Sequence, residues 1–262
     1  MSLIRATQAE FTKHRTTAMW WVMAIVLIVY VGFVAVALAF SLSQAAGGDA
    51  PFGSVRPLYG VAASVGYVVP VIIGALMVTN EFRHQTLTPT FLATPKRSMV
   101  LWAKVIAGAV LGVFYCVVGV IATVAPGAGI LAANDIDPAL GEIETWALLG
   151  RVILAFVLWV VIGVGLGVLV RNQIAAVVGV LAFTIFIEPI LLFVQVSVEG
   201  LADILRVLPG AATNTLIGES IYSVGSTGGD DTEWWVGALL LLGYAAVLLL
   251  LGSLLNWRRD VN

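Results

Sequence analysis

The chain has 262 residues, of which 60% are hydrophobic and only 11% are charged, with a formal net charge of −2 at pH 7. A soluble domain carries about 25% charged residues, so this composition excludes an ordinary soluble protein. Apolar runs of 18 or more residues can cross a bilayer core of about 30 Å. Such runs predict an all-α polytopic membrane protein, one transmembrane domain over residues 1–262, with six transmembrane helices at 20–40, 58–78, 100–124, 146–170, 174–196 and 234–257.

The N-terminal segment, residues 2–16, is predicted to be an amphipathic helix in the membrane interface. Ile4 and Phe11 lie seven residues apart on one helical face, and basic residues flank them. This pattern is typical of a helix that lies on a membrane. A basic front followed by an apolar run also resembles a signal peptide. The apolar run exceeds the 7–15 residues of that region in a signal peptide, so we expect 20–40 to be retained as a span.

The distribution of basic residues predicts the orientation, because lysine and arginine favour the cytoplasmic side. If both termini are cytoplasmic, only Arg56, Arg151 and Arg206 lie outside, and the other ten of the 13 basic residues lie inside. The opposite topology would reverse this bias. We therefore expect a multi-pass protein of the cell (plasma) membrane with both termini in the cytoplasm.

The segment 80–99 is a basic interruption between the second and third apolar runs. The Thr-Pro pair at 88–89 resembles a helix start, with threonine as N-cap and proline in the first helical position. Pro95 would end this short helix, because the residue before a proline is pushed out of the α region. The helix would expose Phe91 and Leu92, and an exposed apolar patch is usually a docking site. The alternative is an interfacial helix that rests on lipid.

The last outer segment, 197–233, is long and only moderately polar. Its apolar residues before Pro209 have helical spacing, and Pro209 is followed by glycine. This pattern predicts two short helices, broken at Pro209, that re-enter the outer leaflet; such structure is tolerated where protein buries the backbone. An ordinary extracellular loop is the alternative. The residues with helical spacing are Leu201, Ile204, Leu205 and Leu208.

Four stretches carry a family resemblance along the chain: "LIRATQAEFTKHRTTAMWW", "NEFRHQTLTPTFLATPKRSMVLWAKVIA", "GLGVLVRNQIAAVVGVLAFTIFIEPIL" and "VLPGAATNTL". They resemble, in this order, the amphipathic N-terminal helix of actinobacterial members, the intracellular loop, the turn between spans four and five, and the segment before the last span of ABC-2 type transporter permeases. These permeases are the membrane subunits of ATP-driven exporters. Gln85 departs from the family, which often has glycine before the threonine, and leaves the local turn geometry open.

The resemblance implies that residues 80–97 form a coupling helix that docks on a separate nucleotide-binding ATPase subunit. A helix that continues out of the second span, braced by Glu81 and Arg83, would act as a lever. One chain supplies six spans, so a full exporter is expected to need a second permease chain, identical to the first, and two ATPase copies. The expected coupling residues are Glu81, Phe82, Arg83, Thr86, Leu87, Phe91, Leu92, Pro95, Lys96 and Arg97.

The sequence has no G-x-x-x-x-G-K-[ST] phosphate-binding loop, so ATP and Mg are expected in the partner subunit, and the chain is not expected to be an enzyme or to hold a cofactor. Two distant histidines and no H-E-x-x-H give no support to a metal site. The stretches "GVGLG" at 163–167 and "GAVLG" at 108–112 lie inside spans and predict close-packing helix faces. Cys116, the only cysteine, is expected to be a small packing residue.

Glu188 is the one acidic residue within a predicted span, and an ionisable group there is a functional-site candidate by default. One interpretation is structural: Glu188 pairs with Arg151, whose estimated depth in the membrane matches. The other is contact with a substrate or a proton.

Two functions remain open from the sequence. The first is a permease, with Tyr30, Tyr67, Phe114 and Tyr115 as candidate residues of the substrate path and a hydrophobic or amphipathic cargo. The second is a membrane-embedded enzyme or assembly factor without a transport cycle. Neither is expected to bind nucleic acid, and the lipid bilayer surrounds the chain in both.

Overall fold

The computed structural model describes residues 2–45, 54–86, 90, 92, 96–194, 205–219 and 233–257. All regular elements in these ranges are helices. Among the described residues, six helical stretches are long and apolar enough to cross a membrane: Met19–Gln44, Pro57–Arg83, Arg97–Ala133, Ile143–Val170, Gln173–Leu191 and Trp234–Leu255. The predicted all-α, six-span architecture is confirmed.

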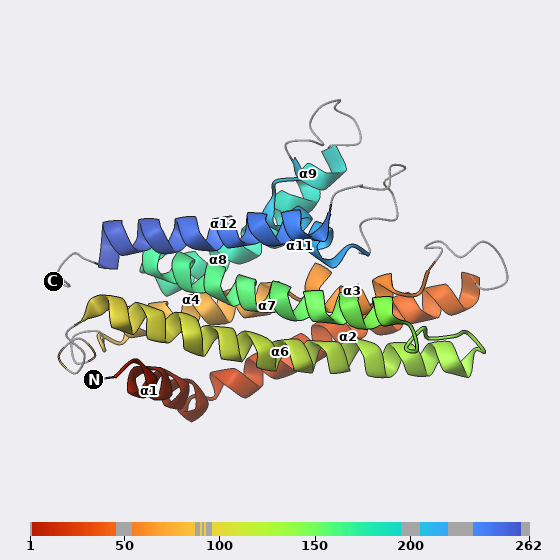
Figure 1. Cartoon of the computed structure of the whole chain (residues 1–262), viewed down its shortest axis with the longest axis horizontal. Helices are drawn as coiled ribbons and strands as arrows, with labels where there is room; N and C mark the ends of the chain where they lie inside the picture. The colour runs from red at the N-terminus through yellow and green to blue at the C-terminus, as the bar shows by residue number, and fades with distance from the viewer. Residues whose placement is uncertain are drawn as a thin grey trace.

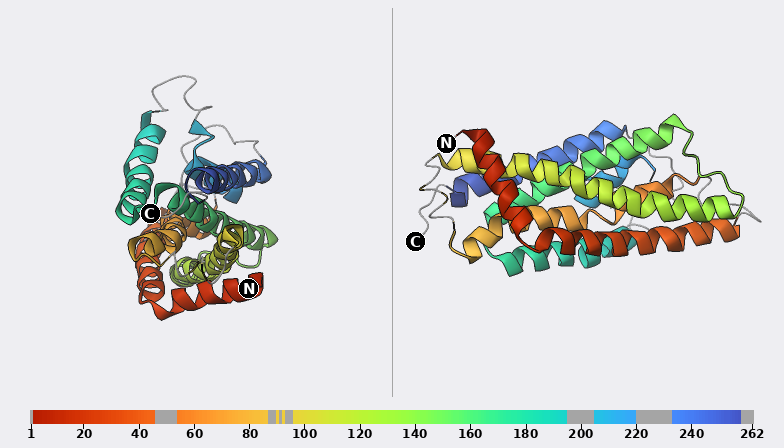
Figure 2. Two further views of the ribbon diagram at one scale, coloured as in Figure 1. Left: turned by 90° about the vertical axis from the view of Figure 1, so that its left-hand side faces the viewer. Right: turned by 90° about the horizontal axis from the view of Figure 1, so that it is seen from below.

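The long helices run alongside one another, and the N-terminal helix α1 (Leu3–Thr16) lies across one end of the bundle (Figures 1 and 2). We call this the α1 end. We call the opposite end the α11 end, after the short helix α11 (Pro209–Ile217), which packs inside the bundle short of that end. The remaining long helices are α2 (Met19–Ala45), α6 (Arg97–Ala133), α7 (Ile143–Val170) and α12 (Trp234–Gly252), which continues as the π-helix η3 (Ser253–Trp257).

The second span is interrupted, whereas the sequence predicted one continuous helix over 58–78. Helix α3 (Pro57–Ser64) ends before Gly66, and α4 (Val68–Arg83) begins after it. A Cβ at Gly66 would collide with the carbonyl oxygen of Ala62, so only glycine fits this turn. Pro70 has no N–H to donate, which the first turn of a helix tolerates because its N–H groups have no partner within the helix. The break places Tyr67 inside the bundle.

The third span is longer than predicted, because α6 continues through Pro126 to Ala133 where an outer segment was expected from residue 125. Two residues of this extension face the bundle. Gly127 packs directly against the side chain of Leu58, and Leu131 is fully buried. Packing against α3 therefore keeps this part of the chain helical.

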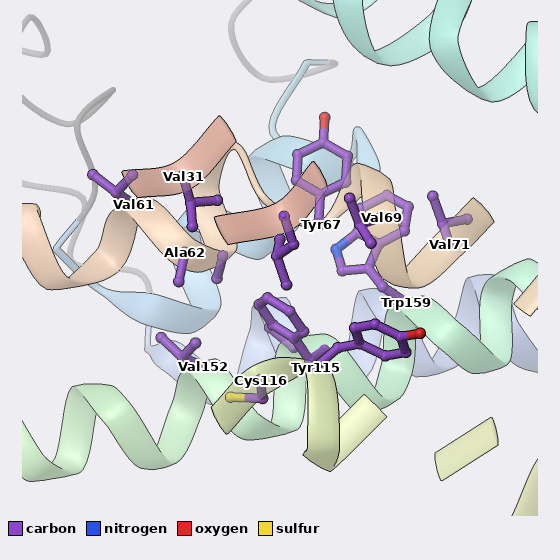
Figure 3. Packing of buried hydrophobic residues seen from close by; sticks show 14 of the residues in the cluster. Val31, Val61, Ala62, Tyr67, Val69, Val71, Tyr115, Cys116, Val152 and Trp159 are labelled. Carbon is purple, nitrogen blue, oxygen red and sulfur yellow. The ribbon is translucent and has the colours of Figure 1, made fainter. Parts of the chain in front are cut away.

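Glycines bring the backbones of α4 and α7 into contact. Added Cβ atoms at Gly74 and Gly163 would collide with the carbonyl oxygens of Val160 and Val71, respectively. Gly112 of α6 similarly packs against the backbone of α7. The two glycine-rich stretches are packing faces, as predicted. Around them lies the apolar core shown in Figure 3, which includes the buried side chain of Cys116.

The fifth span leans away from the others at the α11 end (Figure 1). It consists of α8 (Gln173–Ala182), the π-helix η1 (Phe183–Ile187) and α9 (Glu188–Val194). Nearby, α11 begins with Pro209 in its first turn, as predicted, and packs against α12, where a Cβ at Gly237 would strike the Ala212 carbonyl oxygen. Of the helix predicted before Pro209, residues 201–204 lie outside the described residues, and residues 205–208 form a turn in which Leu208 N donates to the Leu205 carbonyl oxygen.

Candidate functional site

A cluster of charged side chains lies buried at the α1 end, where α1, α4 and α6 meet. Lys104 of α6 is fully buried. Its Nζ lies 2.7 Å from Glu10 Oε2 and 2.9 Å from Glu81 Oε1, and it donates a hydrogen bond of 3.1 Å to the Met77 carbonyl oxygen. A buried ammonium group is costly unless it is paired and hydrogen-bonded, and here it is both.

Lys13 of α1 completes the cluster, with its Nζ 2.7 Å from Glu10 Oε1 and 2.7 Å from Glu81 Oε1. Two lysines and two glutamates thus alternate, and their formal charges cancel. Burial alone would raise the pKa of Glu10, but Lys104 and Lys13 outweigh burial and hold that pKa below its usual value. Burial opposes the charge of Lys13, but the two glutamates outweigh it and raise the pKa of Lys13.

His14 lies beside this cluster and contacts the core. Its Nε2 lies 3.4 Å from Tyr115 Oη, which itself donates a hydrogen bond of 2.9 Å to the Trp20 carbonyl oxygen. Burial lowers the pKa of His14. A cavity of about 300 Å³ opens next to His14 and Lys13, so water and protons can reach both side chains.

Sequence reasoning named Glu81 as a coupling residue but missed Glu10 and Lys104. Lys104 was counted among the cytoplasmic basic residues, with its charge at the membrane interface. The available signal was that Lys104 lies two turns inside an apolar run, where an unpaired lysine would be costly.

The loop between α4 and α6 is partly described. Gln85 has a φ of 54°, in the left-handed region, which is the conformation that the family's glycine would favour. Thr86 N donates to the Glu81 carbonyl oxygen, which closes the end of α4. Leu92 is 79% exposed, as the docking interpretation requires. Leu87, Phe91 and Pro95 lie outside the described residues.

The other predicted coupling residues lie at the same end of the bundle. Arg83 donates a hydrogen bond of 3.0 Å to Gln173 Oε1, which links the end of α4 to the start of α8. The Phe82 ring lies 5.6 Å from the guanidinium carbon of Arg171. Lys96 is exposed, and Arg97 begins α6.

The pairing of Glu188 with Arg151 was wrong. The Tyr67 hydroxyl donates a hydrogen bond of 2.8 Å to Glu188 Oε2, and the backbone amides of Gly210 and Ala211 face the same carboxylate. A Cβ at Gly210 would collide with that carboxylate. Glu188 therefore lies at the N-terminus of α11, where the partial positive charge of a helix favours an anion.

Arg151 lies at the other end of the same helix. Its Nη1 donates a hydrogen bond of 3.3 Å to the Ile217 carbonyl oxygen, the last of α11, and its guanidinium carbon lies 5.4 Å from the centre of a Trp234 ring. The estimate of depth along the membrane normal could not show this arrangement, in which α11 lies between the two charges.

Aromatic and hydroxyl side chains extend the Glu188 site into the core. Tyr67 stacks on Trp159, with ring centroids 4.4 Å apart, and Figure 3 shows the two rings side by side. Trp159 Nε1 donates to Thr213 Oγ1 at 2.9 Å, and Thr213 donates to the Pro209 carbonyl oxygen. The network connects α4, α7, α9 and α11.

The four residues proposed for a substrate path do not converge on one site, although the rings of Phe114 and Tyr115 are in edge contact, with centroids 5.2 Å apart. Tyr30 of α2 and Phe114 of α6 are 41% and 40% exposed on the outside of the bundle. Tyr67 and Tyr115 are buried, and each makes hydrogen bonds to a different site. A cavity larger than the one beside His14 lies between α4, α7, α8 and α12, and none of these four residues lines it.

These features together define a polytopic helical membrane protein with a buried charged cluster at its α1 end and a second buried polar site around Glu188. Residues 6–188 match the model of a family described as ABC-2 family transporter protein. The match covers more than half of the chain, which therefore belongs to the ABC-2 transporter family, a membrane transport component. The search of curated proteins found no match.

Proposed function

We propose that the chain is the permease subunit of an ATP-driven ABC-2 type exporter of the plasma membrane. Two identical copies form the substrate pathway, and two copies of a separate ATPase subunit bind ATP and Mg. The family supports this role. The excess of basic residues in the cytoplasmic set supports a cytoplasmic location for the α1 end, both termini and the loop 80–97.

The charged cluster is the observation that carries this proposal. Glu81 lies near the end of α4, which enters the loop, and Lys104 lies two turns into α6, which leaves it. Their ion pair, joined by Glu10 and Lys13 of α1, ties both helices and the interfacial helix together. A force applied to the loop by an ATPase would therefore move three helices as one unit.

Two apolar residues of the loop provide the test. Phe91→Asp with Leu92→Asp should abolish co-purification of an ATPase subunit with a phosphate-binding loop, because charged side chains cannot dock in an apolar groove. The matched control is Ile143→Asp at the α11 end, since Ile143 is 75% exposed and Leu92 79%. Ile143→Asp should keep the partner. If the double variant keeps it as well, the loop is not the docking site.

The same co-purification from unmodified membranes decides between the permease and a membrane-embedded enzyme or assembly factor. An ATPase that co-purifies and hydrolyses ATP faster in the presence of the permease supports transport. A preparation that never contains an ATPase contradicts it.

A further inference from the structure

An apolar cavity of about 390 Å³ lies between α4, α7, α8 and α12 (helices shown in Figure 1). Its volume falls within the range of pockets that bind small molecules. Val71, Trp159 and Phe183 are among the residues that form its walls. Gly179 also lines the cavity, and a Cβ there would meet nothing within 4 Å. The cavity is therefore open beside Gly179 rather than filled by side chains.

Three of the residues that line the cavity, Thr184, Pro209 and Tyr244, connect it to the Glu188 site. Thr184 precedes Glu188 by about one helical turn, and Pro209 precedes Gly210, against which the Glu188 carboxylate lies. The part of the cavity wall formed by these residues thus adjoins the Glu188 site, although Glu188 itself does not line the cavity.

The Glu188 carboxylate is incompletely satisfied. Oε2 accepts the hydrogen bond from Tyr67, but Oε1 is buried and completes no hydrogen bond, although two backbone amides face the carboxylate. The ion pairs formed among the described residues do not include Glu188. In an apolar bundle, such a carboxylate attracts a positive charge placed nearby far more strongly than it would in water.

The π-helix η1 lies between the apolar walls and the carboxylate. It covers Phe183–Ile187 and ends directly before Glu188. A π-helix is rare and frequently occurs at functional sites, because the wider turn redirects the side chains that follow it. Here η1 supplies Phe183 and Thr184 to the cavity wall, and Glu188 follows η1 directly.

We propose that this cavity binds an amphipathic cation, with an aliphatic or aromatic body in the apolar space and an ammonium group at the end next to Glu188. The assignment of this cavity as a substrate site rests on the proposed permease function. Binding of the cation does not depend on that function, and it is measured with the permease alone.

The test compares dodecylamine, which is cationic at pH 7, with 1-dodecanol, a neutral chain of the same length. The full chain in lipid nanodiscs is heated with a thiol-reactive fluorophore, which reports unfolding when the buried Cys116 becomes accessible. A ligand that binds the native state raises the unfolding temperature. Dodecylamine at saturating concentration should raise it by roughly 5 °C, and dodecanol by clearly less.

Two variants assign the effect to the site. Gly179→Leu fills the open space, so it should remove the shift produced by dodecylamine. Its matched control, Gly150→Leu, also points into open space but lies outside the cavity, and should keep the shift. Glu188→Gln should reduce the dodecylamine shift to that of dodecanol. If Glu188→Gln fails to fold, the Gly179 and Gly150 variants still decide whether the cavity binds.

Equal shifts with the two probes would overturn the cationic selectivity, and no shift, or an undiminished shift in Gly179→Leu, would overturn the site. Absence of a co-purifying ATPase would contradict the permease function without affecting this result.

Discussion

Lys104 is the side chain on which the α1 end depends most. It is fully buried, and its ammonium group has two carboxylate partners from two other helices. The attraction within a buried ion pair roughly offsets the cost of desolvating it, so the cluster adds little net stability as a whole. Removing one member is different, because the remaining charges stay buried without compensation.

Lys104→Met should therefore lower the free energy of unfolding by about 3–5 kcal/mol, since it leaves Glu10 and Glu81 with one cation between them. Thermal unfolding in nanodiscs, followed by labelling of Cys116, measures the loss. Lys96→Met removes an exposed lysine from the same end and should change stability by less than about 0.5 kcal/mol. Equal losses in the two variants would contradict a structural role for the cluster.

Docking of α1 should weaken as the pH falls. Burial lowers the pKa of His14, so its contribution to docking is present above its ordinary value of 6.5 and is lost as the pH falls below it. Glu10, whose pKa is held down, adds a second loss below 4.5. Lys13, whose pKa is raised, contributes below 10.5 and loses this only in more alkaline solution.

Hydrogen exchange of the α1 backbone, corrected for intrinsic rates, should thus show more opening at pH 5.5 than at pH 7.5. His14→Gln should remove this difference, because glutamine does not titrate. If the variant keeps the full difference, a group other than His14 is responsible.

At the scale of elements, α11 is held by opposite charges at its two ends. Glu188 lies at its N-terminus and Arg151 at its C-terminal carbonyl group, which is the arrangement that the helix dipole favours. This arrangement explains how two charges are accommodated in the bundle without touching each other. It also predicts a different response to mutation than a direct pair would give.

Exchanging the charges, with Glu188→Arg and Arg151→Glu together, should not restore stability. A directly paired Glu188 and Arg151 would recover in the double variant, whereas here both ends of α11 would carry the unfavourable charge. Each single change should cost roughly 1–2 kcal/mol or more, and the double variant at least their sum. The yield and the unfolding temperature in nanodiscs measure the stability of the single variants and of the double variant. Recovery of stability in the double variant would instead support a direct ion pair between Glu188 and Arg151.

The turn after α4 contains a conformation that its residue does not favour. Gln85 has a left-handed φ, which costs a non-glycine residue roughly 1–2 kcal/mol. Gln85→Gly should therefore be neutral or stabilising, and Gln85→Val should be destabilising. Gln8→Gly, in the exposed face of α1, is the control and should cost about 1 kcal/mol. The unfolding temperatures of these three variants measure the changes in stability. A clear loss of stability in Gln85→Gly would contradict the left-handed conformation assigned to Gln85.

At the scale of the whole molecule, the six spans could be predicted because length and hydropathy are properties of each segment alone. The close-packing glycines followed from the same local pattern. What the sequence did not provide was position around each helix axis. Depth placed Glu188 and Arg151 at one level but could not show α11 between them. Charge counts placed Lys104 at the surface but could not show that α1 supplies Glu10 to cover it.

The contact between α4 and α7 also determines which parts of the bundle can move relative to one another. Gly74 and Gly163 leave no layer of side chains between these two helices, so neither can slide without a collision of backbones. The two helices therefore act as one rigid unit that extends from the loop 80–97 to the network around Tyr67. Helix α8, in contrast, borders an open cavity, where side chains have room to rearrange. A movement of α4 and α7 that begins at the loop 80–97 is therefore expected to change the packing beside α8 first.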